Sequence, residues 1–155
     1  MKEFEDFTSE EIKTMSLAPL KIIYSIAAKG DPLLKVNGFH VVRAIEYGLI
    51  PPNKNVETFV FLIKTNLDKI HDCFSSESCC GDSTLKQMME LIIATIERRK
   101  ESFDLTEYLT ALKSFADYVA CGKPFGAAFS SMDRNLMTLQ AEFIQSQLSS
   151  SVYLL

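Results

Sequence analysis

The sequence predicts an all-α protein folded as one compact bundle of about six or seven helices. Three observations favour this class. Apolar residues recur at three- and four-residue spacing over most of the chain, for example Phe59, Ile63 and Leu67. Residue pairs with the spacing of a helix-capping box precede several of these stretches. No stretch sustains the period-two alternation with β-branched residues that is typical of strands, so we expect no sheet.

The length and composition indicate a single domain. A chain of 155 residues suffices for one complete core but not comfortably for two. Apolar residues make up 47% and charged residues 23% of the chain, as in an ordinary globular protein. We expect one helical domain over residues 1–148, followed by a flexible apolar tail over residues 149–155.

The first two predicted helices are separated by a proline. Thr8 and Glu11 have the spacing of a capping box, which predicts a helix from Thr8 to about Ser16. Pro19 lacks an N–H and would disturb a helix interior, whereas it is tolerated in a first turn. The sequence therefore predicts a break near Ser16 and a second helix over residues 17–29, which ends at Gly30.

The remaining helices follow from caps and from apolar stripes. Asn37 is placed to cap a third helix, whose stripe begins with Phe39 and Val42 and which ends at Gly48. Two further capping boxes, Asp104 with Glu107 and Ser130 with Asp133, precede the last two helices. The predicted helices after Gly30 are 38–47, 56–74, 83–100, 105–121 and 130–148.

Two segments of the chain share one pattern. Residues 20–37 and 112–130 both open with Leu-Lys, reach a Gly-x-Pro triplet and end with an apolar residue before a capping residue. The triplets are Gly30 to Pro32 and Gly122 to Pro124. This echo suggests two pseudo-symmetric halves, and a ligand or partner is then expected between them.

Short motifs in both segments resemble the TerB-like helical domain associated with tellurite resistance. They are Phe7-Thr8-Ser9-Glu10-Glu11, Ala18-Pro19, Ala28-Lys29-Gly30, Val36-Asn37, Ala120-Cys121-Gly122 and Phe129-Ser130 to Asp133. The resemblance implies a helical bundle with internal two-fold pseudo-symmetry, acting in a stress response as a binding domain without catalytic activity.

The resemblance does not extend to the family's acidic residues. Where the family has Asp between Ala and Gly, this chain has Lys29 and Cys121, and His40 stands where an acid would follow in the next helix. Only Asp133 keeps the acidic character. Because an ammonium group repels a divalent cation, no metal site is transferred from the family.

The densest chemical cluster is His71 with Cys73, Cys79 and Cys80. Thiolates and an imidazole can bind zinc or another soft metal or metalloid, and an exposed vicinal cysteine pair can be redox-active. The spacing is poor for zinc, since Cys79 and Cys80 are adjacent and no C-x-x-C pair occurs. A plain loop over residues 75–82 is the simpler interpretation, so no cofactor is expected.

Charge and patterning exclude several classes of function. With 16 basic and 20 acidic residues the net charge is −4, which disfavours binding to nucleic acid or to an anionic membrane surface. No secretory signal and no span of about 20 apolar residues is present. We therefore expect a cytoplasmic protein with reduced cysteines.

The residues indicate binding rather than catalysis. Neither His40 nor His71 has a nucleophile in a recognisable motif, so no catalytic residue is assigned. The tail Val152, Tyr153, Leu154 and Leu155 is an apolar end that could dock on a partner, on a second copy or on its own bundle. The leading hypothesis is a non-enzymatic protein-interaction or self-association domain in a TerB-like stress response. The alternatives are a metal- or metalloid-binding stress protein and a helical enzyme.

Overall fold

The computed structural model describes residues 7–30, 38–50, 57, 60–61, 63–64, 82–98, 106–125 and 130–150. Over these residues it contains helices and no strand, which confirms the all-α class. The elements are α1 (Ser9–Gly30), α2 (Gly38–Gly48), α5 (Asp82–Arg98), α6 (Thr106–Ala120), the 3-10 turn η2 (Lys123–Phe125) and α7 (Ser131–Ser150). Ser149 and Ser150, which the sequence placed in the tail, continue α7.

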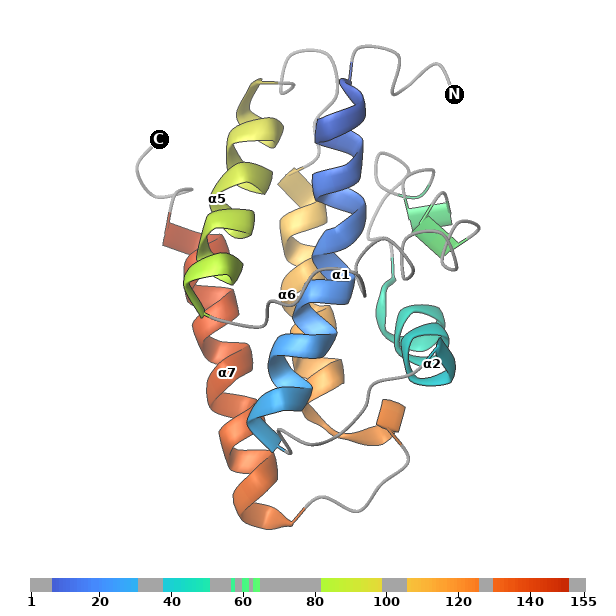
Figure 1. The fold of residues 1–155 in the computed structure, drawn as a ribbon, viewed down its shortest axis with the longest axis vertical. Coiled ribbons are helices and arrows are strands. Elements are labelled where there is room, and N and C mark those ends of the chain that lie inside the picture. Colours follow the sequence, from blue (N-terminus) through green and yellow to red (C-terminus); the bar gives the residue numbers. More distant parts are fainter. Residues whose placement is uncertain are drawn as a thin grey trace.

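Among the helices that the structure describes with their bounds, α1, α5, α6 and α7 run along the length of the molecule and α2 lies beside them. Figure 1 shows α1, α5, α6 and α7 along the long axis, with α2 seen nearly end-on at one side. α7 packs on α6, α1 and α5, whereas α2 packs on α6, η2 and α1. The helices α2 and α7 therefore flank opposite sides of the bundle.

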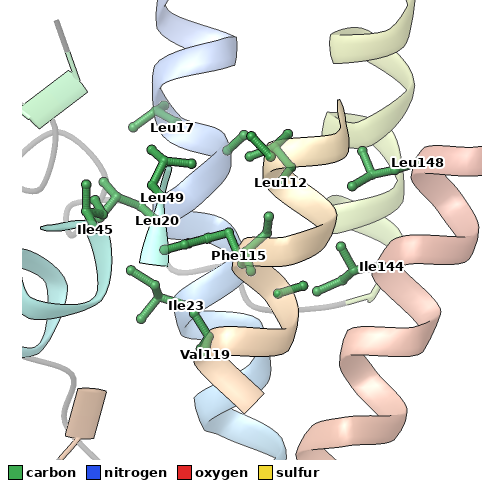
Figure 2. Close-up of a cluster of buried hydrophobic side chains, with 14 of the residues drawn as sticks. Leu17, Leu20, Ile23, Ile45, Leu49, Leu112, Phe115, Val119, Ile144 and Leu148 are labelled. Atoms are coloured by element: carbon green, nitrogen blue, oxygen red, sulfur yellow. The ribbon is translucent and has the colours of Figure 1, made fainter. Parts of the chain in front are cut away.

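The core follows the apolar stripes of the sequence. On α7 the buried side chains Met137, Ala141, Ile144 and Leu148 recur at four- and three-residue spacing, which places them on one helix face. Figure 2 shows how Phe115 of α6 lies among side chains from the neighbouring helices. The labelled members of this cluster are Leu17, Leu20, Ile23, Ile45, Leu49, Leu112, Phe115, Val119, Ile144 and Leu148.

The predicted break near Ser16 is wrong, because α1 is one continuous helix with Pro19 inside it. A proline at this position cannot donate to the carbonyl oxygen of Met15, four residues earlier. Tyr108 of α6 supplies the missing donor: its hydroxyl donates to the Met15 carbonyl oxygen at 2.7 Å, and its side chain is fully buried. A tertiary contact thus compensates for the local defect that the sequence pattern treats as a helix end.

Two of the predicted capping boxes are confirmed. The Thr8 N–H donates to Glu11 Oε1 at 2.9 Å, and the Glu11 N–H donates to Thr8 Oγ1 at 3.0 Å. Ser130 and Asp133 form the same reciprocal pair before α7, with both distances at 3.1 Å. The third box includes Asp104, which lies outside the described residues.

The third predicted helix forms, and its predicted apolar stripe packs on the core except at Phe39. Val41, Ala44, Ile45 and Leu49 are buried, whereas Phe39 is 68% exposed. The reason is that α2 lies against α6 and η2 through the face of Val41, Ala44 and Ile45, which leaves Phe39 outside the contact. Phe39 is therefore a surface residue rather than the start of a core stripe.

The two Gly-x-Pro corners differ at their glycines. Gly122 has a φ of 83° and is the glycine with positive φ in the described part of the chain, whereas Gly30 ends α1 without one. The Gly122 N–H donates to the Val119 carbonyl oxygen at 3.1 Å, which closes the end of α6. The shared sequence therefore produces two different helix ends.

The predicted helix over residues 56–74 lies mostly outside the described residues. The positions described within it, 57, 60, 61, 63 and 64, are helical. Val60 and Ile63 are buried in the main core, in agreement with the predicted stripe.

Candidate functional site

A groove of about 480 Å³ lies where α2 meets the end of α6 and η2. We call it the α2 groove. Its floor and walls combine aromatic, aliphatic and charged side chains from three elements. The lining residues are Phe39, Val42, Arg43, Glu46, Tyr47, Tyr118 and Lys123.

The amphipathic pattern of α2 positions one wall of this groove. Its buried residues hold one face on the bundle, so Phe39, Arg43 and Tyr47, at four-residue spacing, project from the other. Tyr47 is 64% exposed. Gly48 ends the helix without a side chain, and a methyl group there would lie only 2.9 Å from Cγ of Tyr118. This glycine allows the ring of Tyr118 to close the groove at its base.

The turn after α6 positions the other wall. Its backbone is fixed by the bond from the Phe125 N–H to the Gly122 carbonyl oxygen, at 3.2 Å. Phe125 is buried, and its ring lies edge-on to that of His40 with centroids 5.6 Å apart. This contact holds η2 against α2 and places Lys123 at the rim.

The groove carries a local excess of positive charge on an acidic protein. Its two cations, Arg43 and Lys123, face one carboxylate, Glu46, so the net formal charge is +2 − 1 = +1. Neither cation forms an ion pair with another described residue. Burial raises the pKa of Tyr118, and the neighbouring Cys121 and Tyr47 raise it further, against a lowering by Arg43. The phenol of Tyr118 is therefore neutral at physiological pH.

A second hollow, of about 350 Å³, lies between the start of α1 and α5. Arg98 donates to Glu11 Oε2 at 3.0 Å, while the other oxygen of this nearly buried carboxylate accepts the capping bond from Thr8. The sequence patterns did not indicate this pair, because its two residues lie far apart in the chain. Both oxygens of the Glu11 carboxylate thus accept hydrogen bonds. The contact between Glu11 and Arg98 in this hollow holds α1 against α5.

Buried polar side chains form a further cluster within the bundle. Gln140 of α7 donates to the hydroxyl of Ser25 on α1 at 2.5 Å, and Lys21 is fully buried one turn before Ser25. Both polar residues of the Gln140–Ser25 pair are inaccessible to solvent. The bond therefore fixes the register of α1 against α7 and offers no ligand site.

Several residues singled out in the sequence fall outside the described part of the structure. They are His71, Cys73, Cys79 and Cys80 of the proposed soft-metal cluster, and Val152, Tyr153, Leu154 and Leu155 of the proposed docking tail. Of the cysteines, the described Cys121 is exposed and its Sγ donates to the Tyr118 carbonyl oxygen at 2.7 Å. The soft-metal cluster and the docking tail therefore stay predictions.

Within the described residues, no three His, Cys, Asp or Glu side chains gather closely enough to hold a metal ion. The helices of that part also include none with the length and apolar character needed to cross a membrane. The α2 groove was missed from the sequence, because its residues come from elements far apart in the chain. The spacing of Phe39, Arg43 and Tyr47 was the one local signal of a shared face.

Comparison with known proteins adds no assignment. No family model, curated protein or solved structure matches this chain. The TerB-like resemblance therefore stays a prediction from short motifs.

Proposed function

We propose that the protein is a non-enzymatic interaction domain that binds an amphipathic helix of a protein partner in the α2 groove. The observation that carries this proposal is the composition of the groove: exposed aromatic side chains beside cations that have no ion-pair partner among the described residues. Tyrosine and arginine are enriched at the energetic centres of protein interfaces.

The exposure of the Phe39 and Tyr47 rings to water is unfavourable in free energy. Phe39 and Tyr47 are both more than half exposed, and Val42 lies between them on the same wall. Covering such apolar surface contributes about 25 cal/mol per Å². Exposed apolar groups that cluster beside a hollow are typical of interaction sites.

The lining chemistry favours recognition over bond-breaking. Among the described lining residues there is no serine, cysteine or histidine to act as nucleophile or base. Arg43 and Lys123 would instead pair with carboxylates of the partner, and a positive groove on a protein of net charge −4 orients an acidic ligand. The expected ligand is a helix that combines apolar anchors with acidic flanks.

Three wider elements of the hypothesis stay predictions. They are the TerB-like stress context, the pseudo-symmetry of the two halves and the soft-metal alternative at His71, Cys73, Cys79 and Cys80. The metal alternative is tested by elemental analysis of protein purified without chelator, with Cys79→Ser and Cys80→Ser as the matched variant.

Selection of displayed helical peptides tests the groove directly. Peptides are selected on the wild-type protein and their affinities are then measured for Phe39→Ala with Tyr47→Ala. We expect at least a tenfold loss of affinity, since truncation of interface anchors removes about 1.4 kcal/mol or more. The control is Leu91→Ala, an exposed residue on α5, which should bind as wild type. Selected peptides that bind the groove variant with unchanged affinity would contradict the proposal.

A further inference from the structure

We propose that the occupant of the α2 groove is helix α7 of a second copy, so that the protein self-associates head to tail. This inference rests on the proposed function of the groove and names its partner. It joins two different surfaces of the molecule, one cationic and aromatic and the other apolar with acidic flanks.

Helix α7 has a second apolar face in addition to its buried one. Met132 and Leu139 are 68% and 60% exposed, Leu136 is also exposed, and Phe143 is partly buried. The spacing of four, three and four residues aligns these side chains in one stripe along the helix. We call it the α7 stripe. A helix that only covered a core would be polar on its solvent side.

The stripe has the spacing that a helix uses when it docks in a groove. Its ends, Met132 and Phe143, are separated by about 16 Å at a rise of 1.5 Å per residue. The aromatic wall of the α2 groove, from Phe39 to Tyr47, extends for about 12 Å by the same rise. Two to three turns of α7 can therefore place their apolar side chains along the groove.

The charges of the two surfaces are complementary. Asp133 and Glu142 flank the α7 stripe on its two sides, one near the start and the other near the end of the stripe. The groove presents Arg43 and Lys123 beside a single carboxylate, Glu46. Arg134 is separated from Leu136 by about half a helical turn and belongs to another face. Docking the stripe in the groove thus brings acids toward cations, which favours encounter and orientation.

The same charges disfavour symmetric pairing. Two α7 stripes facing each other would bring carboxylates of both copies together, and two α2 grooves would bring cations together. Because α2 and α7 flank opposite sides of the bundle (Figure 1), a groove cannot reach the stripe of its own chain. The contact is therefore between unlike surfaces of two copies, which produces a ring or an open chain.

Mixing of two complementary variants tests this arrangement by sedimentation velocity. Arg43→Glu reverses a groove charge and leaves the stripe intact, whereas Leu139→Glu disrupts the stripe and leaves the groove intact. Both residues are exposed, so folding should be unaffected, which circular dichroism verifies. We expect the wild type to associate with rising concentration and each variant alone to associate at least tenfold more weakly. An equimolar mixture should form a one-to-one complex, because one intact groove and one intact stripe remain.

The control is Arg134→Glu, on another face of α7, which should associate as wild type. A wild type that stays monomeric up to its solubility limit overturns the inference, as does association that neither variant weakens. Association that both variants weaken but that mixing does not restore would indicate a symmetric contact and also overturns it. If displayed peptides still require Phe39 and Tyr47 in any of these cases, the proposed function stands and only the self-association fails.

Discussion

At the scale of single residues, the hydroxyl of Tyr108 supports the continuity of α1. It is fully buried and donates at 2.7 Å to the Met15 carbonyl oxygen that Pro19 leaves without a helical donor. A buried carbonyl without a donor is unfavourable by about 1–3 kcal/mol. Burial also raises the pKa of Tyr108 above its ordinary value of 10.0, so the phenol stays protonated in the folded chain.

We expect Tyr108→Phe to lower the free energy of unfolding by about 1–3 kcal/mol at neutral pH, since only the hydroxyl is removed. The pKa of Tyr108 is raised on folding, so its contribution is complete below pH 10 and declines as the unfolded tyrosine ionises. The decline is about 1.4 kcal/mol per pH unit above that point. Urea denaturation of both proteins at about pH 8 and about pH 10.5 measures this, and the difference between them should shrink at the higher pH. A constant difference would contradict the role assigned to the phenol.

At the scale of elements, the continuity of α1 depends on α6. The helix crosses Pro19 without ending, although a proline inside a helix is unfavourable by about 3 kcal/mol. Two conditions are met here: the chain is capped at its start by Thr8 and Glu11, and the free carbonyl receives the Tyr108 donor. The capping box in turn is fastened to α5 by the Glu11–Arg98 pair. Helix α1 is thus held by α5 at its start and by α6 near Pro19.

A double-mutant cycle between Pro19 and Tyr108 tests this dependence. In Pro19→Ala the new N–H can donate to the Met15 carbonyl oxygen, which then has a donor in addition to the hydroxyl of Tyr108. We expect Tyr108→Phe to be less destabilising in the Pro19→Ala background by about 1 kcal/mol. The measurement is urea denaturation of the four proteins of the cycle.

The matched control for this cycle is Lys13→Ala, an exposed substitution on the same helix. Its effect should add to that of Tyr108→Phe within about 0.5 kcal/mol. If Pro19→Ala is equally additive, the hydroxyl does not replace the missing proline donor.

At the scale of the whole molecule, the described helices share one core. Phe115 of α6 is fully buried and lies among side chains of α1, α2 and α7 (Figure 2). Removal of such a side chain is expected to weaken every helix that touches it. The same shared core fixes α2 on one side and α7 on the other, which separates the two surfaces of the proposed self-association.

We expect Phe115→Ala to lower the free energy of unfolding by about 3–5 kcal/mol, because it removes buried apolar surface and leaves a cavity. Unfolding should remain one transition, with helical circular dichroism and tyrosine fluorescence coinciding along the urea titration. The control Leu139→Ala, at an exposed position, should change stability by no more than about 0.5 kcal/mol. Two separate transitions in the wild type would show that the helices do not form one cooperative unit.

Local chemistry determined much of this fold. The capping boxes at Thr8 and Ser130 can be read from the sequence because each bond joins residues three apart. The buried stripe of α7 is equally local, since the helical period alone places Met137, Ala141 and Ile144 on one face. These features depend on neighbours in the chain and need no knowledge of the partner helices.

Tertiary structure decided the rest. Only the approach of Tyr108 allows α1 to cross Pro19, and only the packing of α2 on α6 and η2 turns Phe39 to the surface. The candidate groove depends wholly on such contacts, because Tyr118 and Lys123 reach α2 from a distant part of the chain. The sequence by itself therefore determined that the described segments are helical and how the helices after Thr8 and Ser130 are capped. Long-range packing decided which helix faces remain exposed for binding, since a face is buried only where another element packs on it.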